Sequence, residues 1–148
     1  MDLVKPVSPV SRHVAVLMGE LMLQIREIFA AEDWQGLRQS HFRLLSMIPE
    51  HGVSITELGE LLGMTKQGCG QFVAFLADSG YLLVTENPDD RRVRLVQRTA
   101  LGDRTVQAVD KRIYRIEQQW AEQVGARRYA TFRRVLMELS EEADAALR

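Results

Sequence analysis

The feature that most constrains this chain is a pair of short helix signals joined by a tight turn near the middle of the sequence. Ser54 is followed three residues later by Glu57. At this spacing the two side chains form a capping box, in which each accepts the other residue's backbone N–H at the start of a helix. Gly63 supplies the turn that follows, and Thr65 suits the cap of a second helix over residues 66–78. Two short helices joined through a glycine turn form a helix-turn-helix.

Apolar residues recur at helical spacing in both short helices, so each helix should bury one face. The residues expected to face inward are Ile55, Leu58, Leu61 and Leu62 in the first helix, and Cys69, Phe72, Val73 and Leu76 in the second. The residues left on the exposed face of the second helix are Gln67, Gly70, Gln71 and Ala74. The second helix therefore has one apolar side for packing and one polar side for solvent or a partner.

A β-hairpin is expected directly after the second short helix. Residues 81–85 change to a strand-like period, and residues 87–90 are the turn formers Asn-Pro-Asp-Asp. On the return, Val93, Leu95 and Val96 are interleaved with Arg92, Arg94 and Gln97. A hairpin that follows a helix-turn-helix in this way is a wing.

Charge is unevenly distributed along the chain. The net charge is −1, but residues 87–134 carry 12 Lys and Arg against 6 Asp and Glu. Charges farther apart than a Debye length of about 8 Å are screened, so a polyanion responds to this local excess more than to the net value. The basic segment includes the predicted wing, and it favours binding to a phosphate backbone.

Long amphipathic stretches lie on both sides of the winged segment. Residues 10–30 and 36–48 have apolar stripes at steps of three and four, and so do two stretches separated by Gly125. The stripe that follows Thr99 comprises Val106, Val109, Ile113, Ile116, Trp120 and Val124. Helices this long need a partner surface that one small lobe does not offer, so we expect a homodimer.

Together these elements predict a mainly α protein: a winged helix-turn-helix with a two-stranded β wing, flanked by N- and C-terminal dimerisation helices. We expect one domain over residues 1–148. Within it, residues 36–102 form the winged-helix lobe, and residues 1–35 and 103–148 form the dimerisation helices. The composition, 46% hydrophobic and 26% charged, is typical of a folded globular protein.

The sequence from residue 37 to residue 102 resembles the MarR (multiple antibiotic resistance regulator) family. The matching segments are LRQSHFRLL at 37–45, TELGELLGMTKQ at 56–67, GYL at 80–82 and NPDDRRVR at 87–94. Thr99 and Gly102 complete the match after the wing. A Pro-x-Asp-Arg-Arg run shortly after a helix-turn-helix is a specific sign of this family, although the same run without that context would be weak evidence.

This resemblance implies a transcription regulator that binds duplex DNA as an intertwined homodimer on an inverted-repeat operator. The two recognition helices would enter successive major grooves, and wing arginines would enter the flanking minor grooves. In the family, small aromatic or anionic effectors, or thiol oxidation, release the DNA. The sequence departs from the family pattern at two points. Gly68 and Gly70 lie within the recognition helix, each costing about 1 kcal/mol of helix propensity relative to alanine, and Arg98 stands where an apolar residue is usual.

The exposed face of the second short helix supplies the candidate base-reading residues. Gln67 and Gln71 can each pair with adenine N6 and N7, and Gly70 lets the backbone approach closely. Thr65 and Lys66, at the helix N-terminus, suit phosphate oxygens. The alternative for all of these is an ordinary polar helix face, and the winged context favours DNA contact.

The wing supplies a second set of candidates: Asp90, Arg91, Arg92 and Arg94. A narrow A·T minor groove has an enhanced negative potential that attracts arginine. Asp90, two residues before Arg92, can hold that guanidinium through a bidentate pair and set its direction. For Arg91 a solvated charged turn is also a reasonable interpretation.

The effector site is the least constrained part of the sequence. We expect a small aromatic or anionic molecule to bind near residues 25–45, and the candidate residues are Phe29, Trp34, His41, Phe42 and Trp120. More often such aromatic residues belong simply to the core. Two alternatives stay open: a thiol-redox sensor acting through Cys69, and a winged helix that binds protein instead of DNA. A protein-binding wing, however, has no need of three arginines.

Several function classes find no support in the sequence. There is no glycine-rich phosphate loop, metal cluster, or nucleophile with a matching base, so we expect neither an enzyme nor a cofactor or metal site. Cys69 is the single cysteine, which excludes an internal disulfide. Residues 1–9 lack the pattern of a signal peptide and no apolar run is long enough for a membrane span, so we expect a cytoplasmic protein.

Overall fold

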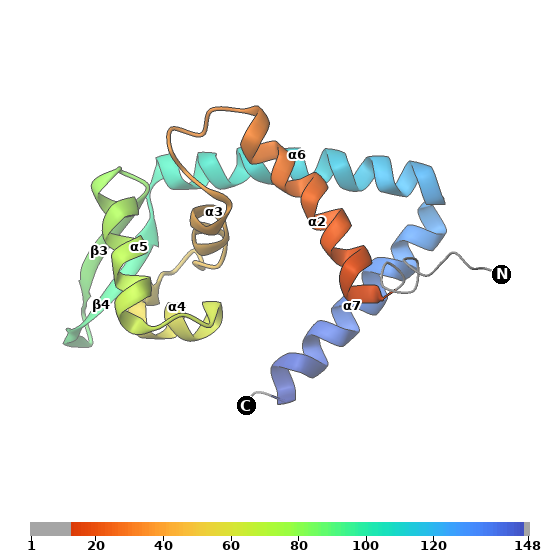
Figure 1. Cartoon of the computed structure of the whole chain (residues 1–148). Helices are drawn as coiled ribbons and strands as arrows, with labels where there is room; N and C mark the ends of the chain where they lie inside the picture. Colours follow the sequence, from red (N-terminus) through yellow and green to blue (C-terminus); the bar gives the residue numbers. More distant parts are fainter. Residues whose placement is uncertain (1–12, 147–148) are drawn as a thin grey trace. The chain divides into compact units, whose positions relative to one another are not determined.

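The structure, a computed structural model, describes residues 13–146. Its elements in chain order are α2 (Val14–Ala31), α3 (Gln39–Ser46), β2 (Val53–Ser54), α4 (Ile55–Leu62), α5 (Lys66–Asp78), β3 (Leu82–Asn87), β4 (Asp90–Arg98), α6 (Ala100–Val124) and α7 (Ala126–Ala146). The fold is mainly α with one small antiparallel sheet, as the sequence predicted (Figure 1). None of the helices within residues 13–146 has the length and apolarity needed to cross a membrane.

The chain divides into two compact units, Met1–Asp110 and Lys111–Arg148. The first contains the predicted winged helix, and the second contains the end of α6 and all of α7. In the second unit Gly125, at φ +95°, separates the two helices. The hydroxyl of Tyr129 in α7 donates to Glu117 Oε1 of α6 at 2.6 Å, which ties the two helices together.

The start signals of the helix-turn-helix act as the sequence predicted. The Ser54 hydroxyl accepts the Glu57 N–H at 3.1 Å, and the Glu57 carboxylate accepts the Ser54 N–H at 3.2 Å, so α4 begins with a complete capping box. Gly63, at φ +65°, ends α4 in the left-handed conformation that glycine adopts most readily. Thr65 then accepts the Gly68 N–H at 3.0 Å and starts α5 at the expected residue.

The prediction that one residue of α4 is buried is wrong. Leu61 was expected to be buried, but 53% of it is exposed, whereas Leu58, Gly59 and Leu62 are buried. A side chain built on Gly59 would lie 3.3 Å from the Met64 carbonyl oxygen. Because Gly59 has no side chain, the start of α5 packs closely on that side of α4, and Leu61 turns outward.

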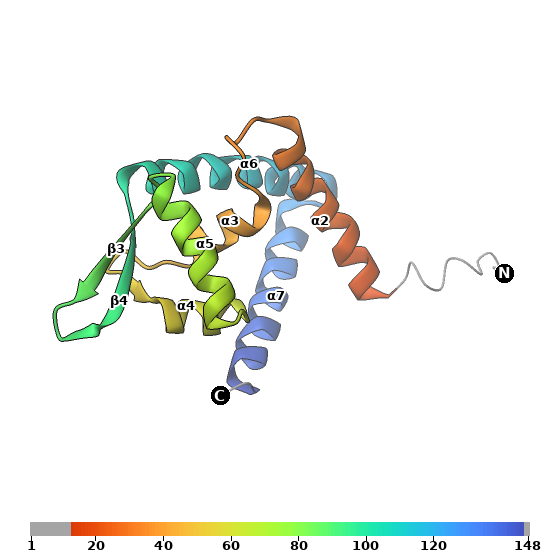
Figure 2. The same ribbon diagram turned by 60° about the vertical axis from the view of Figure 1, so that its left-hand side comes forward.

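The wing is an antiparallel hairpin of β3 and β4, with Pro88 and Asp89 as its two-residue turn. It extends away from α4 and α5, and the view turned by 60° shows the same projection (Figure 2). The sequence did not reveal a third strand, β2, whose Val53 pairs with Val96 of β4. The sheet order is β2-β4-β3, so the wing is anchored to the chain just before α4.

The core of the first unit lies where α3, α4, α5 and β4 meet. Its most buried side chains include Leu44, Leu45, Ile48, Leu58, Val73, Leu76 and Val96. The helix expected over residues 36–48 is shorter in the structure, where α3 spans Gln39–Ser46. The predicted helix at 10–30 is α2, and its expected first residues, 10–12, lie outside the described residues.

Candidate nucleic-acid interface

The outer face of α5 is as the sequence predicted. Gln67, Gln71 and Ala74 are exposed, and Gly70 lies on the same side of the helix. The opposite side holds Cys69, Val73 and Leu76, all of them buried. The helix is thus fixed by its apolar side, and a row of short and amide side chains faces solvent.

The N-terminus of α5 is exposed at Thr65 and Lys66. The Thr65 oxygen accepts the Gly68 N–H, and its hydroxyl proton stays available as a donor. The Lys66 ammonium lies at the same helix end, where unpaired backbone N–H groups and the helix dipole favour an anion. Both residues are therefore exposed at the end of the helix that favours an anion.

At the wing, Asp90 holds the side chain of Arg92 in two places. Arg92 Nε donates to Asp90 Oδ1 at 3.1 Å, and Arg92 Nη2 donates to Oδ2 at 3.3 Å. The Arg92 backbone N–H donates to the same carboxylate at 3.1 Å. These side-chain and backbone hydrogen bonds hold the pKa of Asp90 below its usual value. The Arg92 side chain is nevertheless 91% exposed. Asp90 therefore sets its direction, while the guanidinium stays open to solvent or a partner.

The register of the hairpin changes at its tip. Glu86 pairs with Arg94, yet the next residue, Asn87, pairs with Asp90. Residues 91–93 therefore have no partner on β3, and they bulge from the ladder. Arg91 and Arg92 lie in this bulge and are exposed, whereas Arg94 lies in the regular ladder opposite Glu86.

Three of the predicted effector residues come together. The rings of Phe29 and Phe42 are 4.9 Å apart, those of Trp34 and Phe42 are 5.2 Å apart, and those of Phe29 and Trp34 are 6.2 Å apart. Trp34 Nε1 donates to the Ile28 carbonyl oxygen at 3.2 Å, which fixes the indole. We call Phe29, Trp34 and Phe42 the aromatic cluster.

The ring of His41 packs against α5 and not against the aromatic cluster. Its ring stacks on Phe75 of α5 at 4.9 Å and meets Phe72 edge-on at 5.2 Å. Its Nδ1 accepts the Arg38 backbone N–H at 2.8 Å. Partial burial and, to a smaller extent, the Arg38 charge lower the pKa of His41 from its ordinary value. The structure therefore places His41 between α3 and α5, apart from the aromatic cluster.

Trp120 and Cys69 are the two remaining candidates. Trp120, the fifth effector candidate, is half-buried on α6 and belongs to the second unit, whereas the other four belong to the first. Cys69 is fully buried, and burial raises the pKa of its thiol. A buried thiol with a raised pKa is the opposite of a reactive cysteine, which needs exposure and thiolate character.

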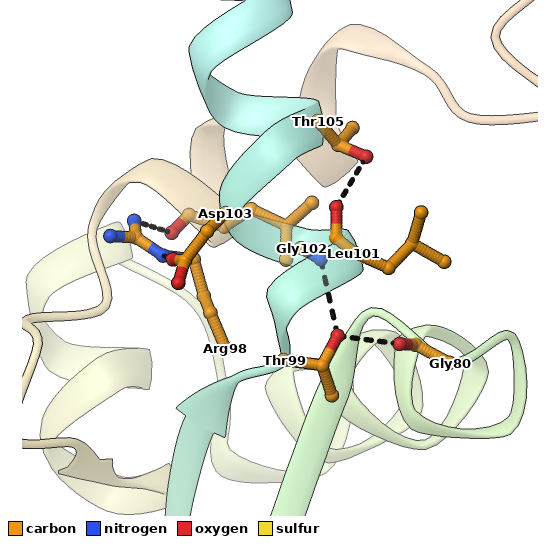
Figure 3. A network of polar contacts seen from close by, with 8 residues as sticks. Gly80, Arg98, Thr99, Leu101, Gly102, Asp103 and Thr105 are labelled. Atoms are coloured by element: carbon orange, nitrogen blue, oxygen red, sulfur yellow. Dashed lines mark hydrogen bonds and ion pairs between the residues drawn. The ribbon is translucent and has the colours of Figure 1, made fainter.

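Sequence reasoning left Arg98 without a role, and the structure supplies one. Arg98 Nε donates to Asp103 Oδ1 at 2.8 Å, and Arg98 Nη1 donates to the Leu45 carbonyl oxygen at 2.9 Å (Figure 3). One guanidinium thus joins the end of β4 to the last turn of α3 and the first turn of α6. The available signal was a charged residue at a usually apolar position, with an acid five residues later.

The same junction holds the base of the wing to α6 (Figure 3). The Thr99 hydroxyl donates to the Gly80 carbonyl oxygen at 2.6 Å and accepts the Gly102 N–H at 3.1 Å, so Thr99 caps α6 as expected. A Cβ on Gly102 would overlap the carbonyl oxygen of Tyr81. Glycine is therefore required where α6 passes the start of the wing.

Within the part of the chain that the structure describes, no group of three or more His, Cys, Asp and Glu side chains could hold a metal ion. The exposed groups of α5 and the wing are amides, a helix N-terminus and the guanidinium that Asp90 directs. These groups suit hydrogen bonding to base edges and pairing with phosphates.

Comparison with known proteins agrees with this geometry. Residues 35–93 match the model of the MarR family. This range covers α3, β2, α4, α5 and β3 and reaches into β4, so it includes both the helix-turn-helix and the tip of the wing. Among curated proteins, an uncharacterized protein of Mycobacterium tuberculosis is 29% identical over 107 residues, which are 72% of this chain and 73% of that protein.

Solved structures share the fold over almost the whole chain. FabT of Streptococcus pneumoniae, solved in complex with DNA, has a TM-score of 0.77 at 11% identity, covering 94% of this chain and 98% of FabT. The PcaV transcriptional regulator of Streptomyces coelicolor, solved with its natural ligand, has a TM-score of 0.69 at 21% identity, covering 97% and 99%. Residues 35–93 are therefore similar to the MarR family, and the chain shares the fold of solved structures that include the PcaV transcriptional regulator and FabT.

Proposed function

We propose that this protein is a ligand-responsive repressor that binds an inverted-repeat operator as a homodimer. The observation that carries the proposal is the combination of the exposed polar face of α5 with an arginine that Asp90 directs at the wing. A winged helix that does not bind DNA has no use for that combination. Each part of the proposal rests on a different group of residues.

DNA recognition is assigned to α5 and the wing. Gln67 and Gln71 would pair with base edges in the major groove, because a glutamine amide matches adenine N6 and N7. Thr65 and Lys66 would bind phosphates at the start of α5. Arg92 would enter the minor groove, and Arg91 and Arg94 would contact the flanking backbone.

The homodimer is assigned to the N- and C-terminal helices, residues 1–35 and 103–148. In the single chain, large apolar side chains stay exposed along α2 and α7: Val14, Leu17, Met18, Met22 and Leu23, and Val135, Met137 and Leu139. Exposed apolar surface of this extent is a feature of interaction sites, and a second copy of the chain would cover it. Two-fold symmetry then requires an inverted repeat, with half-sites about 10–11 bp apart.

The effector is assigned to the region of the aromatic cluster. Phe29 and Trp34 are half-buried over the buried ring of Phe42, and they offer an apolar surface for a small aromatic or anionic molecule. PcaV, which shares the fold, was solved with its natural ligand. A ligand can lower DNA affinity only if it binds the DNA-incompetent dimer better than the competent one, because equal affinity shifts no equilibrium.

The test is selection of duplexes from a random-sequence library by the purified protein, followed by competition with a panel of small aromatic acids. We expect enrichment of an inverted repeat and release by at least one acid, with Cys69→Ser behaving like the wild type. Absence of any enriched sequence would reject DNA recognition. If only peroxide releases the DNA and Cys69→Ser removes that response, the protein is a thiol sensor and the effector assignment is wrong.

A further inference from the structure

A glycine at the centre of the recognition face is not required by the fold. Gly70 lies in the middle of α5, on the side that also carries Gln67, Gln71 and Ala74 at spacings of three and four residues. Its backbone is right-handed helical, since it is absent from the positive-φ glycines. A Cβ built on Gly70 meets no atom within 4 Å. Alanine would therefore fit here without any rearrangement of the protein.

Other glycines in the described helices have an internal reason. A Cβ on Gly59 would lie 3.3 Å from the Met64 carbonyl oxygen, and a Cβ on Gly68 would lie 3.0 Å from the capping Thr65 hydroxyl. A Cβ on Gly102 would overlap the Tyr81 carbonyl oxygen. Gly19 of α2 is the other helical glycine with open space around it, and it lies on a helix that we assign to the dimer.

Glycine in a helix interior destabilises the helix relative to alanine, because it loses more backbone freedom on folding. In α5 this penalty applies at Gly70 although nothing inside the protein demands it. A partner that approaches this face of the helix closely would account for the glycine. On α5 that surface is the one assigned to the major groove.

We propose that Gly70 sets the depth to which α5 enters the major groove, by letting the edge of a base pair approach the helix backbone. This inference rests on the proposed DNA recognition and deepens it. Gln67 lies one turn before Gly70, and Gln71 is the next residue. A base-pair edge seated over Gly70 brings both amides within reach of neighbouring bases. A methyl group at this position holds the helix farther out and weakens both contacts.

The experiment compares wild type, Gly70→Ala and Gly70→Ser on two duplexes: one selected by the wild type from a random library, and one unrelated duplex of equal length. Melting of the DNA-free proteins is measured in parallel. We expect Gly70→Ala to melt about 2–5 °C higher than wild type, because it restores helix propensity. Its affinity for the selected duplex should fall at least about 10-fold, as expected when base contacts are lost. Affinity for the unrelated duplex should not change, and Gly70→Ser should lose as much specific affinity as Gly70→Ala, or more.

Opposite effects on stability and on specific affinity separate this role from a folding role. If Gly70→Ala binds the selected duplex as tightly as wild type, the inference is wrong while DNA recognition stands. If the variant melts lower and loses affinity for both duplexes alike, Gly70 serves the fold and the inference is again wrong. If wild type selects no duplex at all, the proposed function fails, and this inference fails with it.

Discussion

Arg98 and Asp103 form an ion pair of 2.8 Å between the end of the wing and the first turn of α6. The same guanidinium donates to the Leu45 carbonyl oxygen in the last turn of α3, 53 residues earlier in the chain. Three elements of the winged helix therefore meet at one side chain. The position of the wing relative to α3 and α6 depends on a residue that lies outside the recognition surface.

The two contacts of Arg98 should differ in their contribution to stability. Arg98→Met keeps an unbranched apolar stem but removes the charged donor to the Leu45 carbonyl oxygen, which keeps only the longer bond from the Ile48 N–H at 3.3 Å. We therefore expect the free energy of unfolding to fall by about 1–2 kcal/mol. Asp103→Asn removes only the more exposed ion pair, and its effect should stay below about 1 kcal/mol. Chemical denaturation of both variants measures this. Equal losses from the two substitutions would show that the Leu45 contact is unimportant.

At the wing, Arg92→Ala should weaken DNA binding by about 1–3 kcal/mol and leave the protein folded. Arg91→Ala is the matched control, because both arginines are exposed in the same bulge but only Arg92 is paired with Asp90. Arg91→Ala should lose less DNA affinity than Arg92→Ala. Fluorescence anisotropy with a selected duplex gives both values, and small, equal effects would exclude Arg92 as the minor-groove residue.

On α5, the residues proposed to read bases and the one proposed to bind phosphate should respond differently to substitution. Gln67→Ala and Gln71→Ala should relax the preference at particular base pairs. Lys66→Ala should weaken binding to every sequence alike. It should also reduce the slope of log affinity against log salt concentration by about one, because one fewer counterion is released on binding. Binding measured across single-base variants of the selected duplex at several salt concentrations separates these outcomes. A uniform loss from all three variants would mean that the reading face is misplaced.

The capping role of His41 predicts a pH dependence of stability. The pKa of His41 lies below its ordinary value of 6.5, mainly through burial and then through Arg38. The unfolded chain therefore takes up the proton first as the pH falls, and stability present above pH 6.5 is lost below it. Protonation also removes the Nδ1 acceptor for the Arg38 N–H.

The control for this prediction is His41→Gln, because glutamine can cap the same N–H without titrating in this range. Denaturation at pH 7.5 and 5.5 should show a larger loss of stability in wild type than in His41→Gln. The same pH dependence in both proteins would assign the effect to other groups.

Local signals were sufficient to predict most of the winged helix. The boundaries of α5 follow from the Thr65 cap and the residues that follow it, because capping depends on contacts within one turn. The pairing of Asp90 with Arg92 was predictable for the same reason, since the two residues are two apart in the chain. The exposed face of α5 followed from helical periodicity alone.

Features set by distant contacts were not predictable in this way. Strand β2 exists because Val53 meets Val96, 43 residues later, and two residues have no strand pattern of their own. His41 and Phe42 are adjacent, yet the first ring packs on α5 and the second joins the aromatic cluster. Neighbouring residues on a helix point about 100° apart, so closeness in sequence did not place them in one site.

The most direct test of the account is a footprint of the full-length protein on a selected duplex, with light scattering of the DNA-free protein. We expect a dimer at micromolar concentration, and protection of two symmetric half-sites about 10–11 bp apart from centre to centre. Protected major-groove segments should be flanked by protected minor grooves that become accessible in Arg92→Ala. A folded monomer that protects a single unsymmetrical site at full affinity would contradict it.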